Sequence, residues 1–259
     1  MGKFLYVGNE KLYVRGVTYG PFRPGPDGCE YYDLHAVEAD FARIARSGIN
    51  AVRTYTVPPR WLLDCAREHG LWVLVGLPWE QHVAFLHDRR LSRTIGRRIR
   101  NGVRACAGHP ALLGYAIGNE VPSAVVRWHG HRRVERHIEG LYRAAKEEDP
   151  DALVSYVNYP TTEYLELPFV DLVCFNIFLE SPEALDGYLA RLQNLAGDKP
   201  LVLSETGLDS RRHGLDGQAR ALDWQIRTSF AAGCAGVFVF AWTDEWHRGG
   251  ADIAEWSSG

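Results

Sequence analysis

Several signatures of common protein classes are missing from this chain of 259 residues. It has no long basic run, and its formal net charge is −3, which argues against a nucleic-acid-binding protein. The N-terminal residues lack the apolar core of a signal peptide. No apolar stretch approaches the roughly 20 residues that cross a bilayer. We therefore expect a cytoplasmic or cytoplasm-facing protein with no membrane span in this chain.

Cysteine is scarce and is not paired. The chain has five cysteines at wide spacings and no Cys-x-x-Cys. A disulfide framework needs paired cysteines and an oxidising compartment, so we expect free, partly buried thiols. The histidine-rich segment 128–137 has two histidines two residues apart, but no further ligands complete a familiar zinc set. We expect neither a metal ion nor an organic cofactor.

Two catalytic motifs are also absent. No Gly-x-Gly-x-x-Gly follows the first apolar run, which argues against a dinucleotide-binding half. No Gly-x-Ser-x-Gly occurs anywhere, which argues against a hydrolase with a serine at a nucleophile elbow.

What the chain does contain is a regular alternation of short apolar runs and helix-like segments. Several runs are apolar at nearly every position, as in strands of a parallel sheet that is covered on both faces. The eight predicted strands are Leu12–Thr18, Asn50–Tyr55, Trp72–Leu77, Leu112–Ile117, Leu153–Val157, Leu172–Asn176, Leu201–Ser204 and Val237–Trp242. The predicted helices are Asp33–Ser47, Pro59–His69, Leu91–Ala107, Arg132–Glu148, Pro182–Leu195 and Gln218–Ala232. Eight strands in this length favour an α/β fold of the (β/α)₈ TIM barrel type.

The two ends of the chain depart from this repeat. The start predicts a small hairpin around Gly8 and Asn9 that closes the bottom of the barrel. Only a short, polar, glycine-rich stretch follows Trp242, so the eighth helix is expected to be missing or reduced. We expect residues 1–259 to form one catalytic domain and to be a piece of a longer protein, to which further domains could be fused.

Two carboxylates stand where predicted strands end. Glu120 follows Asn119 in "YAIGNEVP", and Glu205 lies in "LVLSETG". In a barrel the chemistry sits at the carboxyl ends of the strands, so these two side chains are expected to face each other across the mouth. Such a pair can serve as acid/base and nucleophile in glycoside hydrolysis, where two carboxyl groups flank an oxocarbenium-like transition state.

The motifs "GNE" and "SETG", with "LYVRGVTYGPF", "INAVRTYTVPP" and "FAWTDEW", resemble the (β/α)₈ retaining glycoside hydrolases of clan A, and most closely the catalytic domain of glycoside hydrolase family 2. The resemblance implies that Glu120 is the acid/base and that Asn119 binds the sugar 2-hydroxyl. It also implies that Glu205 is the nucleophile, that Arg53 keeps this carboxylate ionised, and that Trp242 forms the floor under the sugar.

One position departs from this family. Relatives often carry a tyrosine two residues after the strand-six asparagine, where it hydrogen-bonds the nucleophile, and this chain has Phe178 there. Tyr159, Tyr55 and Tyr19 are the alternatives for supplying that hydroxyl.

Further strand-end residues are candidates for sugar subsites, because aromatic faces and a few polar groups line such sites. Trp79, Tyr159 and Glu245 are the candidates for substrate binding. The alternative for each of them is an ordinary residue at the rim of the barrel that does not contact the substrate.

The sequence thus predicts a retaining β-glycoside hydrolase or transglycosylase that acts on a β-linked oligosaccharide or polysaccharide. Arg53 should favour the anion of Glu205, and the nearby charge should raise the pKa of Glu120. Retention requires a carboxyl separation of about 5–5.5 Å. The alternatives are a non-catalytic carbohydrate-binding barrel and an accessory module of a glycan-synthesising protein.

Overall fold

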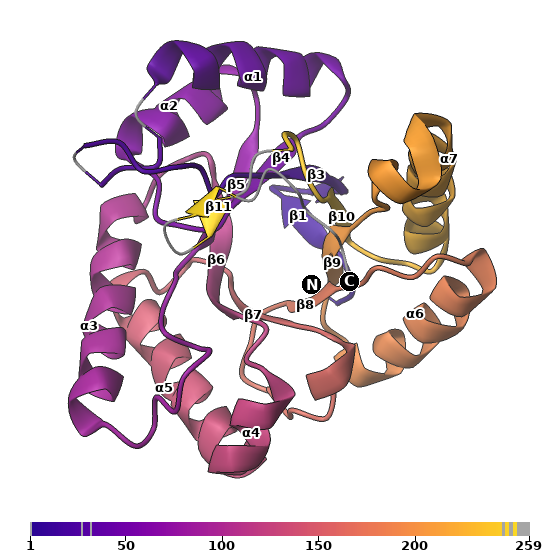
Figure 1. Ribbon diagram of the computed structural model, residues 1–259. Helices are drawn as coiled ribbons and strands as arrows, with labels where there is room; N and C mark the ends of the chain where they lie inside the picture. Colours follow the sequence, from indigo (N-terminus) through magenta and orange to yellow (C-terminus); the bar gives the residue numbers. More distant parts are fainter. Residues whose placement is uncertain (1, 27, 32, 245–246, 249–250, 253–259) are drawn as a thin grey trace.

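The computed structural model describes residues 2–26, 28–31, 33–244, 247–248 and 251–252, and these form a closed barrel with helices around it (Figure 1). Eight parallel strands close in the order β10-β3-β4-β5-β6-β7-β8-β9. They are β3 (Val14–Tyr19), β4 (Ala51–Thr54), β5 (Trp72–Gly76), β6 (Leu112–Asn119), β7 (Val154–Asn158), β8 (Val173–Asn176), β9 (Leu201–Thr206) and β10 (Gly236–Val239). The predicted (β/α)₈ barrel is confirmed.

Helices cover the outside of this barrel. They are α1 (Leu34–Arg46), α2 (Arg60–Glu68), α3 (Arg89–Cys106), α4 (Ser123–His129), α5 (His131–Glu148), α6 (Pro182–Ala196) and α7 (Ser210–Ala231). Only a 3₁₀ turn, η1 (Pro160–Thr162), lies between β7 and β8, and no helix follows β10 in the described residues. None of the helices in these residues has the length and apolarity needed to cross a membrane. The five cysteines are free, as predicted.

The strands are buried on both faces, and this explains their continuous apolar runs. All four residues of β4 and all six of β9 are buried, because one set of side chains fills the barrel and the other packs under the helices. The interior is tight near β3 and β10. A Cβ on Gly16 would lie 2.1 Å from the ring of Phe238, so the absence of a side chain at position 16 allows this ring to fill the barrel.

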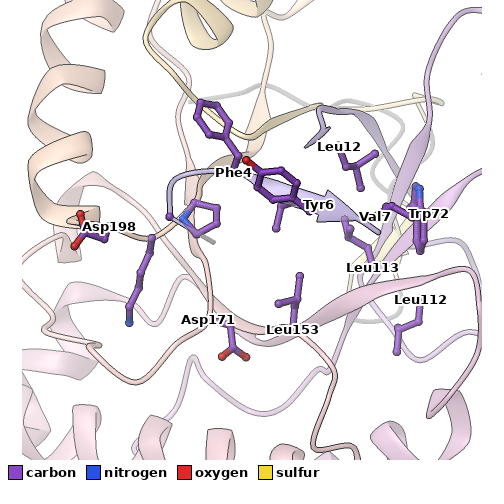
Figure 2. A pocket seen from close by; sticks show the side chains of 14 residues that line it. Phe4, Tyr6, Val7, Leu12, Trp72, Leu112, Leu113, Leu153, Asp171 and Asp198 are labelled. Atoms are coloured by element: carbon purple, nitrogen blue, oxygen red, sulfur yellow. The ribbon is translucent and has the colours of Figure 1, made fainter. Parts of the chain in front are cut away.

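The N-terminal hairpin lies at the end of the barrel away from the strands' carboxyl ends. Strand β1 (Leu5–Val7) pairs antiparallel with β2 (Glu10–Leu12), and Leu5 packs into the core inside the barrel. A cavity of about 550 Å³ lies between this hairpin and the starts of neighbouring strands. Figure 2 shows its mostly apolar lining, which includes Tyr6, Trp72 and Leu153. The hairpin therefore covers the bottom of the barrel and leaves the opposite end for chemistry.

Two local predictions differ from the structure. Residues 123–129 are not among the predicted helices, and they form the short helix α4, which ends at Gly130 with φ of 80°. This glycine also precedes α5, so one residue with positive φ separates the two helices. Strand β6 also runs to Asn119 rather than ending at Ile117, because Asn119 pairs with Val157 of β7 and its backbone bonds the Gln81 side chain.

Candidate active site

Glu205 lies near the end of β9 and is buried, with 7% of its surface exposed. Its Oε1 atom accepts a hydrogen bond from Arg53 at 3.0 Å. Arg53 comes from β4, is 1% exposed, and also donates to the Ser204 carbonyl at 2.7 Å, to Asn176 Oδ1 at 3.1 Å and to Asn119 Oδ1 at 2.7 Å. The guanidinium thus connects residues at the ends of four strands around one carboxylate.

A tyrosine also donates to Glu205. The Tyr55 hydroxyl lies 2.8 Å from Glu205 Oε1, whereas the Tyr19 and Tyr159 hydroxyls bond other groups. Phe178 stands where relatives often have a tyrosine, and this residue is 42% exposed. Phe178, after β8, has no hydroxyl to donate to Glu205. Tyr55, which follows β4, donates instead, and it is one of the three tyrosines that the sequence left open.

Asn176, at the end of β8, joins the two carboxylates. Its Nδ2 atom donates to Glu120 Oε1 at 2.7 Å and to Asn119 Oδ1 at 3.2 Å. Its Oδ1 atom accepts from Arg53, which in turn donates to Glu205. The two predicted catalytic side chains therefore lie at the two ends of one hydrogen-bonded network. The sequence placed Asn176 at a strand end but assigned it no role.

The backbone turns sharply at Glu120. Its φ is 53°, the one positive value at a non-glycine residue among those that the structure describes. Such a conformation costs about 1–3 kcal/mol and persists where surrounding contacts impose it. The Glu120 N–H donates to the Val157 carbonyl at 2.9 Å, and the Val121 N–H donates to the Tyr156 hydroxyl at 2.8 Å. These contacts turn the Glu120 side chain toward the mouth instead of along the strand.

Burial and hydrogen bonding act in opposite directions on Glu205. The pKa of Glu205 is raised to about 7, mainly by burial, and the charge of Arg53 opposes this rise. The nearby Glu120 also acts to raise the pKa, while the Tyr55 hydrogen bond acts to lower it. Arg53 therefore favours the anion as expected, yet desolvation outweighs it, and Glu205 titrates near neutral pH.

Trp79 and Tyr159, two of the predicted substrate contacts, lie in different surroundings. Trp79 is buried, and its indole N–H donates to the Ile117 carbonyl at 2.8 Å. This position differs from the predicted sugar contact, because the ring lies in the core beneath β6. The Tyr159 hydroxyl accepts a hydrogen bond from the Ser123 N–H at 3.2 Å, at the start of α4.

Trp242 follows β10 and is half-buried against the core. Its backbone N–H donates to the Thr18 carbonyl at 3.1 Å, which ties it to the neighbouring β3. Glu245 lies outside the described residues. Within the described part of the chain, no group of three or more histidine, cysteine, aspartate or glutamate side chains could hold a metal ion.

Several solved glycosidase structures have a similar fold. A β-glucuronidase of Ruminococcus gnavus has a TM-score of 0.76 at 15% identity, with 93% of this chain and 45% of that chain covered. A family 2 β-galacturonidase of Eisenbergiella tayi has a TM-score of 0.76 at 21% identity and the same coverage. Bacteroides uniformis β-glucuronidase 2 has a TM-score of 0.78 at 16% identity, with 93% and 32% covered.

This chain therefore spans less than half of each of these structures, and the likeness concerns the fold. A search of curated proteins found no match. The family model described as "Glycosyl hydrolases family 2, TIM barrel domain" matches residues 1–222. With the barrel and its two joined carboxylates, this match shows that the chain belongs to the TIM barrel domain of the glycosyl hydrolases of family 2.

Proposed function

We propose that this domain hydrolyses β-glycosides with retention, with Glu205 as nucleophile and Glu120 as acid/base. The observation that carries the proposal is the buried network in which Arg53 bonds Glu205 and Asn176 bonds Glu120, with the two joined by an Arg53–Asn176 hydrogen bond. One carboxylate has a cation and a tyrosine to support its charge. The other lies in reach of the first, at the end of another strand.

The proposed reaction has two steps. Glu205 attacks the anomeric carbon while Glu120 gives its proton to the glycosidic oxygen, so that the leaving group departs as an alcohol and a glycosyl ester forms. Glu120 then takes a proton from water, which attacks the same carbon and releases Glu205. A sugar hydroxyl in place of this water gives transglycosylation. A covalent step has a parallel in the similar B. uniformis enzyme, whose structure holds a covalently bound cyclophellitol-derived aziridine.

The first step requires that Glu120 and Glu205 together carry one proton. Glu205 must be ionised to attack, and Glu120 must be protonated to donate. Because the two groups interact, this proton belongs to the pair and leaves it in a coupled titration. Asn176 donates to Glu120 and Arg53 donates to Glu205, so the network can adapt as the charge moves between the two carboxyl groups.

Glutamine at position 120 tests the acid role. Glu120→Gln should lower kcat/KM by roughly 10²–10⁴-fold on β-glycosides with poor leaving groups. Dinitrophenyl β-glycosides, whose leaving group needs no proton, should lose far less in the first step. Initial rates over a series of aryl and alkyl leaving groups measure this difference. The substrate panel should include β-glucuronides and β-galacturonides, because the similar structures include enzymes named for them.

Product stereochemistry tests the mechanism directly. Proton NMR of the first product from the wild-type protein should show the β-anomer before mutarotation. The α-anomer as first product would exclude retention. Tight binding of β-linked oligosaccharides without turnover would instead favour a carbohydrate-binding barrel.

Tyr55 has a predicted effect on pH dependence. Its hydroxyl lowers the pKa of Glu205, so Tyr55→Phe should raise that pKa and shift the acidic limb of kcat/KM to higher pH. We expect a shift of about 1 unit, which is about 1.4 kcal/mol, and a kcat reduced most below pH 7. The matched control is Tyr188→Phe, which removes another 2.8 Å tyrosine–glutamate hydrogen bond far from the site. An unchanged acidic limb in Tyr55→Phe would contradict the role.

A further inference from the structure

Gln81 follows β5 and meets the end of β6, where that strand lacks a neighbour on one side. The last backbone hydrogen bond between these strands runs from the Leu77 N–H to the Ala116 carbonyl at 2.9 Å. Strand β6 continues beyond it to Asn119. On its other side β6 remains paired with β7, where Asn119 faces Val157.

The side-chain amide of Gln81 occupies the vacant edge. Its Oε1 atom accepts from the Asn119 N–H at 2.9 Å, and its Nε2 atom donates to the Asn119 carbonyl. One amide thus bonds both backbone groups of one residue, as a neighbouring strand would do. Gln81 is itself held, because it is 9% exposed and its N–H donates to the Trp79 carbonyl at 2.8 Å. The indole of Trp79 in turn bonds Ile117 of β6.

The residue clamped in this way precedes the proposed acid/base. The side chain of Asn119 accepts from Arg53 and Asn176, and its carbonyl belongs to the peptide that leads into Glu120. Glu120 has the φ of 53°, a conformation that relaxes toward negative φ when its contacts are lost. The Gln81 amide fixes this peptide plane, and with it the direction in which the Glu120 carboxyl leaves the strand.

We propose that Gln81 is a positioning residue that aims the Glu120 carboxyl at the glycosidic oxygen by clamping the backbone of Asn119. The inference rests on the proposed function and extends it to a side chain that need not touch the substrate. A displacement of about 1 Å in a reacting group can cost roughly 10²-fold in rate. The effect should appear only where proton donation limits the reaction.

The test compares Gln81→Met with wild type on two β-glycosides of one sugar. Methionine keeps the length of the side chain and removes both hydrogen bonds. With an alkyl leaving group, which needs the proton, kcat/KM should fall by roughly 10²-fold. With a dinitrophenyl leaving group, the fall in the first step should stay below about 5-fold, since no proton is needed. Gln193→Met is the matched control, because that amide bonds a distant backbone carbonyl, of Ala232, at 2.9 Å.

A second variant covers the case in which Gln81→Met does not fold. Gln81→Asn keeps the amide but is one methylene shorter, so its hydrogen bonds to the Asn119 backbone are weakened without adding a charge. It should show the same dependence on the leaving group with a smaller loss. An equal loss on both substrates, or none, in the folded variants would overturn the inference. The proposed function would still stand if Glu205→Gln abolishes turnover and Glu120→Gln lowers it mainly on the alkyl glycoside. Wild-type protein without turnover on any β-glycoside would overturn the proposed function and the inference with it.

Discussion

Glu205→Gln is expected to lower kcat by roughly 10⁵-fold on every β-glycoside that the wild-type protein cleaves, because the amide cannot form the glycosyl ester. A good leaving group should not restore the rate, in contrast to Glu120→Gln. Stopped-flow measurement with a dinitrophenyl β-glycoside should show no burst of released phenol in the variant. A variant that keeps more than a hundredth of the wild-type rate would exclude Glu205 as the nucleophile.

A smaller residue at the same position allows a positive test. Glu205→Gly leaves room for azide beside Arg53, and azide attack from that side should give the α-glycosyl azide. Glu120→Gly leaves room on the other side, so azide there should attack the glycosyl ester and give the β-glycosyl azide. The two products have opposite configuration because one reaction includes one displacement and the other includes two. The same anomer from both variants would contradict the assigned roles.

The loss of activity in Glu205→Gln should come with a gain in relative stability above neutral pH. The pKa of Glu205 is raised from 4.5 to about 7 in the folded protein, so the folded state binds more protons than the unfolded state between these values. The free energy of unfolding of the wild type therefore decreases as pH rises through this window, by up to about 3 kcal/mol. Glutamine does not titrate and removes this decrease.

Urea unfolding at pH 4.5 and pH 8 measures the effect. From pH 4.5 to pH 8 the free energy of unfolding of the wild type should fall relative to that of the variant. If the difference between wild type and variant is independent of pH, Glu205 titrates at its ordinary value in the folded protein. The same urea curves give the folded fraction of the variant under assay conditions, which separates a loss of the nucleophile from a loss of the fold.

The barrel could be predicted from the sequence because its strands are buried on both faces. Apolar side chains at successive positions, as in β9, leave a parallel sheet as the simplest reading. Glu120 and Glu205 were found by the same logic, since carboxylates at the ends of such strands must face the mouth. The pairing of Arg53 with Glu205 was implied by the family resemblance, and the structure has this ion pair at 3.0 Å.

The contacts within the site depend on details that the pattern does not contain. Register shifts occur between Phe175 and Asn176 of β8 and between Ala116 and Asn119 of β6. Simple alternation therefore fails at the strand ends, where the proposed catalytic side chains lie. The sequence pattern also does not show which of the three tyrosines bonds Glu205. Nor does it show that the side-chain amide of Gln81, which follows β5, bonds the backbone of β6. Trp79 illustrates the converse, because a strand-end aromatic turned into the core instead of the mouth.

Arg53→Met is expected to cause the largest loss of stability among the site variants. Arg53 is buried and pairs with a buried carboxylate at 3.0 Å, so its removal leaves Glu205 without a cation at a cost of about 3–5 kcal/mol. The pKa of Glu205 should rise further, and kcat/KM at pH 7 should fall by roughly 10²–10³-fold. Urea unfolding and pH–rate profiles measure the two effects. Arg104→Met, which breaks an exposed pair with Glu148, is the control and should change stability little.

The double variant Arg53→Met with Glu205→Gln separates charge from packing. If the cost of Arg53→Met comes from an unpaired buried carboxylate, it should shrink when Glu205 is replaced, and most of all at pH 8, where the wild-type carboxylate is ionised. If it comes from lost packing and lost bonds to the asparagines, the cost should stay the same in both backgrounds. Arg53→Lys adds a third comparison, since it keeps the charge but loses the planar fork that reaches both Glu205 and Asn119. A lysine variant that restores stability and leaves activity low would show that the fork positions Asn119, while the charge alone balances Glu205.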